Sequence, residues 1–230
     1  MRGVMEIMEN MVELQHVAKA YNKNVLFTDL NLTISRGDVC GIVGPNGSGK
    51  SVLFKMICGM ARPDGGEIFI DGVKLDKGEF PQNIGVILDN SGFLPDETGF
   101  RNLEILAGIR RKANKERLEE AMLQVGLKPE LEVRVAKYSL GMKQRLAIAQ
   151  ALMEEPSLLI LDEPFESIDR EGVVRLRGLL KSLNEEKGVT ILISSHVGED
   201  IRQLCKSVYR VRDQGLHRIE EVDLVWDCEI

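Results

Sequence analysis

The sequence lacks several features that would place it in other classes of protein. Aromatic residues make up only 5% of its 230 residues, so leucine, isoleucine and valine must fill most of the core of a chain that is 43% hydrophobic. No apolar run approaches the roughly 18 residues needed to cross a bilayer, and the first residues lack the continuous apolar stretch of a secretory signal. We therefore expect a cytosolic protein that reaches a membrane only through a partner.

The cysteines and the basic residues are also distributed in ways that argue against two common kinds of site. The four cysteines, Cys40, Cys58, Cys205 and Cys228, show no C-x-x-C spacing, so buried free thiols are favoured over a metal or redox site. The net charge is −6 and acidic residues flank most of the basic ones, whereas binding to nucleic acid requires a clustered basic face. We therefore predict no nucleic-acid partner.

The order of the predicted elements favours an α/β fold with a mainly parallel sheet. Apolar strand patterns alternate with helical patterns along the chain; the strands are predicted at 39–43, 68–70, 158–161 and 189–193, and the helices at 51–57, 173–183 and 201–204. The segment from about 95 to 155 is mostly helical instead, with Asn114 as a candidate cap and a helix over 142–152. We interpret this segment as an insertion between strand-rich parts.

One octapeptide carries the strongest functional signal. Residues 44–51 fit the phosphate-binding pattern G-x-x-x-x-G-K-[ST] without departure, and they join a predicted strand to a predicted helix. The glycines allow successive backbone N–H groups to surround phosphate oxygens, and the helix adds the positive end of its dipole. We expect Lys50 to reach the terminal phosphates of ATP and Ser51 to bind Mg²⁺. The binding residues predicted here are Gly44, Pro45, Asn46, Gly47, Ser48, Gly49, Lys50 and Ser51.

Two adjacent carboxylates follow a second buried strand. Asp162 and Glu163 come directly after residues 158–161, at the end of a strand where parallel sheets place their ligands. Asp162 can hold Mg²⁺ through water, and Glu163 can polarise the attacking water, which makes it the predicted catalytic carboxylate. Taken alone, the pair could instead be a charged turn after a core strand.

With further segments in the same order, these motifs resemble the nucleotide-binding domain of ATP-binding cassette (ABC) proteins. Residues 138–145, Tyr-Ser-Leu-Gly-Met-Lys-Gln-Arg, resemble the family signature, and residues 194–196, Ser-Ser-His, resemble the segment with the switch histidine. The resemblance implies a P-loop NTPase core, an N-terminal antiparallel β subdomain and an inserted α-helical subdomain. It indicates a single ABC ATPase domain at 11–220, a helical subdomain at about 95–155 and a tail at 221–230. Residues 1–10 show no clear period, so we expect a loose extension there, or a start of translation at Met11.

The resemblance also assigns roles to further residues. Tyr21 stands where the family carries the aromatic residue that stacks on adenine, and His196 where a catalytic histidine touches the γ-phosphate. Ser139 and Gly141 would bind ATP held by another protomer, and Ser139 can also cap the helix that follows it. Asp89 stands where the family usually has glutamine; its carboxylate can still serve Mg²⁺ or the attacking water, or it faces solvent.

The implied function is ATP hydrolysis with ATP and Mg²⁺ as cofactors. A second ABC ATPase domain would complete each site in an ATP-dependent head-to-tail dimer, which we expect to be a homodimer. The signature variant is similar to that of cassettes serving ABC-2-type exporters, including peptide-antibiotic resistance and sodium-extrusion systems. We therefore expect the ATPase subunit of an exporter, held at the inner face of the cell membrane by a permease on a separate chain. The alternatives are a soluble ABC ATPase that drives assembly or remodelling of a protein complex, and a binding module without hydrolysis.

Overall fold

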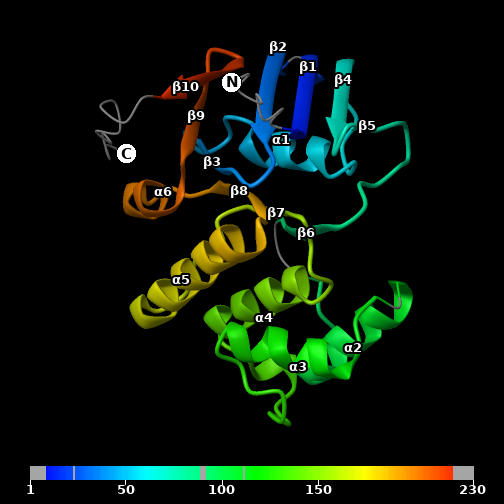
Figure 1. Cartoon of the computed structure of the whole chain (residues 1–230), viewed down its shortest axis with the longest axis vertical. Coiled ribbons are helices and arrows are strands. Elements are labelled where there is room, and N and C mark those ends of the chain that lie inside the picture. The colour runs from blue at the N-terminus through cyan, green and yellow to red at the C-terminus, as the bar shows by residue number, and fades with distance from the viewer. Residues whose placement is uncertain (1–8, 23, 89–91, 111, 220–230) are drawn as a thin grey trace, which may run out of the picture.

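The structure, a computed structural model, describes residues 9–22, 24–88, 92–110 and 112–219. Figure 1 shows two sheets in the upper part of the molecule and a group of helices below them. The expected α/β fold is confirmed: an antiparallel N-terminal sheet, a mainly parallel sheet and an inserted helical subdomain are all present. Asp89 lies outside the described residues, as do residues 1–8 of the expected extension and all of the expected tail.

The antiparallel sheet is formed by the first part of the chain. Its strands lie in the order β2-β1-β4-β5; they are β1 (Asn10–Tyr21), β2 (Asn24–Ser35), β4 (Gly65–Ile70) and β5 (Val73–Lys74). Leu30, Leu32 and Ile34 alternate along β2 and are buried, as their spacing predicts. β1 begins one residue before Met11, the expected start of the ATPase domain.

The second sheet carries the parallel strands. Its order is β10-β9-β3-β8-β7-β6, and every strand runs parallel to its neighbours except β10, which pairs antiparallel with β9. The strands are β3 (Val39–Val43), β6 (Ile84–Ile87), β7 (Leu158–Leu161), β8 (Thr190–Ser194), β9 (Ser207–Arg212) and β10 (Gly215–Ile219). β9 and β10 form a hairpin, and Asp213 and Gln214 between them both have positive φ, as a tight two-residue turn requires.

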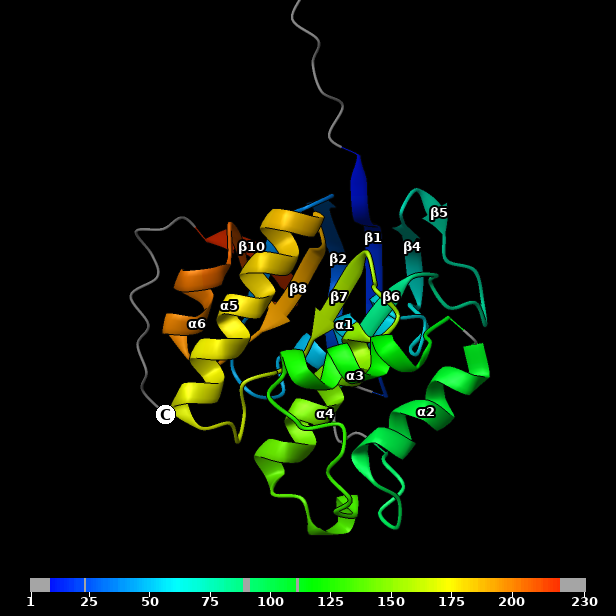
Figure 2. The same cartoon turned by 60° about the horizontal axis from the view of Figure 1, so that its bottom comes forward.

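The helices fall into two groups. The helical subdomain at the bottom of Figure 1 contains α2 (Gly99–Arg110), α3 (Lys115–Gln124), the 3₁₀ helix η1 (Val135–Lys137) and α4 (Leu140–Leu152). The core contains α1 (Lys50–Ile57), α5 (Arg170–Lys187) and α6 (Gly198–Leu204), and Figures 1 and 2 both place α5 beside α6. Of the helices described, none is both long enough and apolar enough to cross a bilayer.

Side-chain caps set where three of these helices begin. Asn114, Ser139 and Asp169 each accept a hydrogen bond from the backbone N–H three residues on, at 3.0, 3.1 and 2.6 Å. The Asn114 and Ser139 caps were predicted, and α4 starts right after Ser139, two residues earlier than its apolar pattern indicated. At the other end of α5, Gly188 has φ 67°, the left-handed conformation expected of a helix stop.

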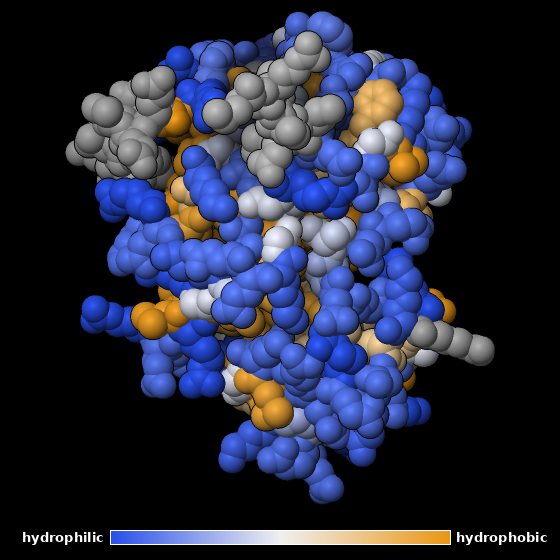
Figure 3. All heavy atoms as spheres, in the orientation of Figure 1, coloured by the Kyte–Doolittle hydropathy of each residue, from blue (hydrophilic) through white to orange (hydrophobic). Residues whose placement is uncertain are grey.

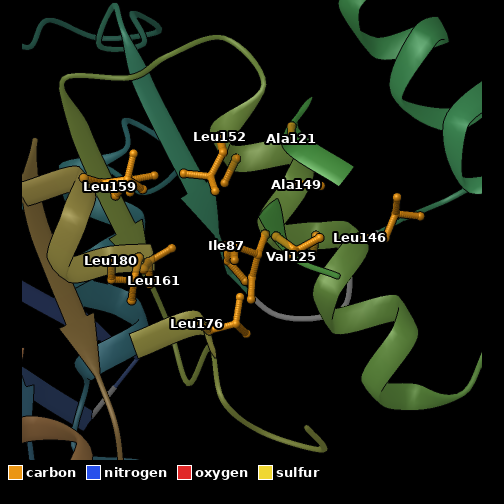
Figure 4. Packing of buried hydrophobic residues seen from close by; sticks show 14 of the residues in the cluster. Ile87, Ala121, Val125, Leu146, Ala149, Leu152, Leu159, Leu161, Leu176 and Leu180 are labelled. Atoms are coloured by element: carbon orange, nitrogen blue, oxygen red, sulfur yellow. The ribbon is translucent and has the colours of Figure 1, made fainter. Parts of the chain in front are cut away.

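The parallel sheet separates two hydrophobic cores. Along β7, Leu158 and Ile160 face α1 and the antiparallel sheet, whereas Leu159 and Leu161 face the helices on the other side. Figure 4 shows residues of the second core, where side chains from α3, α4 and α5 meet those of β6 and β7. Because both faces are covered, β7 is apolar throughout, as the sequence indicated. On the face seen in Figure 3, apolar residues form only separate patches among hydrophilic ones.

Candidate functional site

The loop between β3 and α1 has the conformation of a phosphate cradle. Gly44, Gly47 and Gly49 have φ of 152°, 77° and 110°, values that glycine adopts without strain. Lys50 Nζ points back into the loop and donates to the carbonyl oxygens of Gly44 at 2.7 Å and Pro45 at 3.2 Å. The loop thus holds a cation within a ring of backbone groups at the start of a helix, which suits a multiply charged phosphate.

Ser48 gives a second indication that this loop takes a polar ligand. Its Oγ is buried and has no hydrogen-bond partner among the residues that the structure describes. Buried hydroxyls are normally paired, because leaving one unpaired costs about 1–3 kcal/mol. A phosphate oxygen in the loop would supply the missing partner, so the residues present fit ATP.

Ser51 and Asp162 form the expected oxygen-ligand pair. Ser51 Oγ donates to Asp162 Oδ2 at 2.5 Å, and the backbone N–H of Asp162 is held by the carbonyl oxygen of Ile87 at 2.9 Å. Hydroxyl and carboxylate oxygens are the ligands that Mg²⁺ prefers, and this ion usually takes one or two carboxylates together with phosphates and water. The described part of the chain contains no cluster of three or more His, Cys, Asp or Glu side chains that could hold a metal. Ser51 and Asp162 fit Mg²⁺ that is shared with a nucleotide, because this ion usually takes only one or two carboxylates from the protein.

Glu163 and His196 meet on the neighbouring side of the site. Glu163 Oε2 accepts a hydrogen bond from the backbone N–H of His196 at 3.1 Å and lies 2.9 Å from its Nδ1. The backbone of Glu163 has φ 48°, which is uncommon outside glycine and turns the chain sharply after Asp162. As a result the two adjacent carboxylates have different partners, Ser51 for Asp162 and His196 for Glu163.

Two further residues hold this site together; both belong to motifs identified in the sequence, but the sequence assigned neither of them a role. Ser194 Oγ donates to Asp162 Oδ1 at 2.5 Å and accepts from the backbone N–H of Glu163 at 2.9 Å. Gln144 Nε2 donates to the carbonyl oxygens of Glu163 at 3.4 Å and Pro164 at 3.1 Å. Ser194 ends the strand beside β7, so knowledge of the strand order would have pointed to it.

The phosphate loop and the two carboxylates line one hollow of about 580 Å³. Its lining is largely polar and comprises Leu26, Asn46, Gly47, Gly49, Lys50, Ser51, Val52, Ile87, Gln144, Asp162, Glu163 and Glu166. Tyr21, Ser139 and Gly141 do not line it. Tyr21 ends β1 with 48% of its surface exposed, and Lys19 Nζ lies 4.7 Å from its ring centre.

The signature segment, residues 138–145, presents an exposed surface, and its other side rests on the loop after Glu163. Ser139 is exposed and Leu140 is 70% exposed at the start of α4. A Cβ atom at Gly141 would lie only 2.6 Å from the carbonyl oxygen of Ser167, so glycine permits close contact with the loop after Glu163. One turn further on, Arg145 Nη2 donates to both carboxylate oxygens of Asp169, at 3.0 and 2.8 Å. The first turns of α4 therefore rest on residues 163–169.

Known proteins match this geometry and this sequence. A family model described as "ABC transporter" matches residues 27–166. The bacitracin transport ATP-binding protein BcrA of Enterococcus faecalis is 39% identical over 222 residues, which cover 96% of this chain and 71% of that protein. These matched regions include the phosphate loop, the signature segment and the carboxylate pair.

Solved structures match over similar lengths. The ATP-binding cassette MJ0796, in a dimeric post-hydrolysis state bound to ADP and Pi, superposes with a TM-score of 0.83 at 26% identity and covers 91% of this chain and 98% of that one. CbiO1 from Clostridium perfringens, described as part of the ABC transporter complex cbiONQ, gives a TM-score of 0.76 at 25% identity over 91% of this chain and 87% of that one.

Proposed function

This chain belongs to the ABC transporter family, and on that premise we propose that it powers an exporter as an ATP-dependent homodimer bound to a separate permease. The protein is an ATP-binding and ATP-hydrolysing subunit of a transporter of this family. The observation that carries the proposal is the meeting of Lys50, Ser51, Asp162 and Glu163 around one hollow, with His196 against Glu163. We infer that residues 11–220 form the ATPase domain and about 95–155 its helical subdomain.

The proposed roles follow from the geometry of the site. Lys50 binds the terminal phosphates, and Ser51 and Asp162 hold Mg²⁺, which neutralises phosphate charge when bound. Glu163 orients and polarises the attacking water, and His196 fixes the Glu163 carboxylate through two contacts. Tyr21 stacks on adenine at the edge of the site, and Asp89 is proposed as an additional metal ligand.

The exposed signature surface supports a head-to-tail dimer. Ser139 and Gly141 lie outside the hollow that contains the phosphate loop, so within one chain they do not reach that site. A second copy in two-fold arrangement places the same residues over its neighbour's nucleotide, which is the self-complementary contact that a symmetric dimer requires. Leu140, exposed between them, becomes covered in such a dimer. The finding that a similar cassette is dimeric supports this assembly.

A groove between the core and the helical subdomain supports a second, different partner. It has a volume of about 680 Å³ and is lined by β6, by α2 and α4, and by the segment that precedes β6. Met60, Phe80 and Ile109 lie along it with 58%, 59% and 75% of their surfaces exposed. Apolar side chains gathered around a groove are typical of a docking site. We propose that a segment of the permease binds here, which would hold the protein at the inner face of the cell membrane.

The proposed substrate class is a peptide antibiotic. It rests on the similarity to a bacitracin transport protein and on the signature variant Ser-Leu-Gly-Met-Lys-Gln-Arg. In such a transporter the permease selects the substrate, and this chain supplies the hydrolysis of ATP.

Affinity purification of the protein from detergent-solubilised membranes tests the permease partner. We expect one membrane-spanning protein to co-purify with the wild type and to be lost from Ile109→Glu, because a charge in the groove opposes apolar docking. Leu123→Glu is the matched control, since Leu123 is 58% exposed on α3 and does not line the groove. Recovery of a soluble complex without any membrane protein would favour a remodelling ATPase instead.

A further inference from the structure

The segment that carries His196 is fixed by a buried ionic network outside the nucleotide site. Asp200 is 2% exposed on α6, and Arg177 reaches it from α5 with a side chain that is 14% exposed. Arg177 Nε donates to Asp200 Oδ1 at 2.8 Å, and Nη2 donates to the same oxygen. Neither residue lines the hollow beside the phosphate loop. Any effect of this pair on hydrolysis is therefore indirect.

The other oxygen of Asp200 holds the residue next to His196. Ser195, which is 4% exposed, donates from Oγ to Asp200 Oδ2 at 2.9 Å, and the same Oγ accepts from the backbone N–H of Val197 at 3.0 Å. The backbone N–H of Asp200 donates in turn to the carbonyl oxygen of Val197 at 3.1 Å. These bonds fix the backbone on both sides of His196. The His196 side chain itself is 68% exposed and makes its hydrogen-bond contact with Glu163.

A buried ion pair by itself contributes little to the free energy of unfolding. Desolvation of two charges offsets most of their mutual attraction, and apolar residues of similar volume often stabilise such a site equally well. Apolar residues cannot orient a hydroxyl group, however. Here one oxygen of Asp200 is bound by Arg177 and the other by Ser195, so the pair imposes a direction on the turn that precedes α6.

We infer that Arg177 and Asp200 are positioning residues for hydrolysis, which act by holding His196 within hydrogen-bond reach of Glu163. The inference rests on the catalytic roles proposed above for His196 and Glu163. The pair connects three elements, because Ser195 follows β8, Asp200 lies on α6 and Arg177 lies two turns into α5. The position of His196 is thereby fixed relative to α5, the helix that Asp169 caps.

The test is a kinetic double-mutant cycle between Asp200→Asn and His196→Ala, with Mg-ATP as substrate. We expect Asp200→Asn to lower kcat by about 10-fold or more, the range of a misplaced catalytic group, and to leave KM within about 3-fold. In the His196→Ala background, Asp200→Asn should have no further effect on kcat, because the group it positions is gone. Turnover is normalised to the ATP-binding stoichiometry, so that misfolded protein does not count.

The matched control is a second Arg–carboxylate pair on the same helix. Arg175 and Glu171 lie 3.9 Å apart with exposed side chains, 52% and 91%. Arg175→Met and Glu171→Gln should leave kcat, KM and ATP binding unchanged, because neither residue contacts the turn around His196 or lines the hollow.

Each other outcome has a defined meaning. A wild-type kcat in Asp200→Asn, or an equal loss with and without His196, overturns the inference and leaves the proposed function intact. A wild-type kcat in His196→Ala overturns both the inference and the catalytic role proposed for His196. If Asp200→Asn does not fold, the cycle is repeated with Arg177→Met and Asp200→Leu combined, which replaces the pair with apolar volume. If that variant binds no ATP either, the pair serves folding and the inference fails.

Discussion

Lys50 shows what a single side chain contributes before any ligand arrives. Its ammonium group is held inside the phosphate loop by two backbone carbonyl oxygens, and the residue is 8% exposed. A charge already placed there need not be reorganised when phosphates bind. At an effective dielectric near 20, one unit charge about 4 Å from another contributes roughly 4 kcal/mol.

We predict that Lys50→Ala lowers ATP turnover by at least about 100-fold, because this interaction is lost at the reacting phosphates. The measurement is steady-state release of phosphate at saturating Mg-ATP, with far-ultraviolet circular dichroism to confirm the fold. Lys115→Ala is the control, since Lys115 is exposed on α3. Turnover close to that of the wild type would show that the loop does not bind the terminal phosphates as assigned.

The sequence predicted the parts of the site that form local motifs. The phosphate loop, the adjacent carboxylates and the Ser139 cap depend on neighbours within a few residues, so spacing identifies them. Ser194 acts differently: its two hydrogen bonds reach Asp162 and the backbone of Glu163, 31 or more positions earlier in the chain. Such a role depends on which strands are adjacent, and one sequence does not reveal that.

At the scale of elements, two segments show why the sequence pattern was incomplete. The apolar alternation of β1 cannot be followed to the end of the strand, because the register with β2 shifts between Leu14 and Val17 and His16 has φ 52°. This irregularity interrupts the alternation that identifies a strand. α2 was not located within the helical segment, because its apolar residues lie on two faces, with Leu103 buried but Ile109 75% exposed.

Close contact between β6 and α4 gives a prediction at this scale. A Cβ atom at Gly85 would lie 2.1 Å from the carbonyl oxygen of Ala151, so Gly85→Ala forces the strand and the helix apart. We expect a loss of about 1–3 kcal/mol in the free energy of unfolding, the usual cost of overpacking. Urea denaturation measures it.

Gly108→Ala is the matched control for this substitution. Gly108 is exposed within α2, and a Cβ atom there meets nothing within 4 Å. Alanine should therefore stabilise the protein by about 0.5–1 kcal/mol through its better helix propensity. Equal effects of the two substitutions would contradict the proposed contact.

For the whole molecule, the thiols predict how stability changes at alkaline pH. Burial raises the pKa of Cys40 and of Cys58 to about 12, and burial also raises the pKa of Cys205. In the unfolded chain a thiol ionises near pH 8.5, so above that pH the unfolded state binds fewer protons than the folded state. The buried protonated thiols therefore make their full contribution to the unfolding free energy below about pH 8.5, and this contribution declines as the pH rises toward 12.

We therefore expect the unfolding free energy to fall between pH 8.5 and 10, by up to about 1.4 kcal/mol per pH unit for each thiol. Urea unfolding at several pH values measures the slope. In Cys58→Ala the unfolding free energy should depend less steeply on pH, because the contribution of one thiol is missing; burial alone raises the pKa of Cys58. An identical slope in the variant would show that this thiol does not contribute.

The proposed dimer gives a second prediction at this scale. Glu163→Gln keeps the shape of the site but removes the group proposed to polarise water, so ATP should remain bound and hold two copies together. We expect the variant to elute as a dimer in size-exclusion chromatography with ATP and Mg²⁺, and as a monomer without them. Glu186→Gln, a change at an exposed position of α5, should behave as the wild type. A Glu163→Gln variant that stays monomeric with ATP would contradict the dimer.

Because α4 rests on residues 163–169, ATP hydrolysis at the two sites of the proposed dimer would be coupled in time. Gly141 leaves room for the carbonyl oxygen of Ser167, Gln144 donates to that of Pro164, and Arg145 pairs with Asp169. In a head-to-tail dimer, the signature segment of each copy contacts the nucleotide of the other copy. That segment would therefore move together with the loop that carries Glu163 in the same copy. Neither copy could release the neighbouring nucleotide without disturbing its own. Hydrolysis at the two sites would therefore proceed at one common rate, and a subunit with a defective site would slow an intact partner.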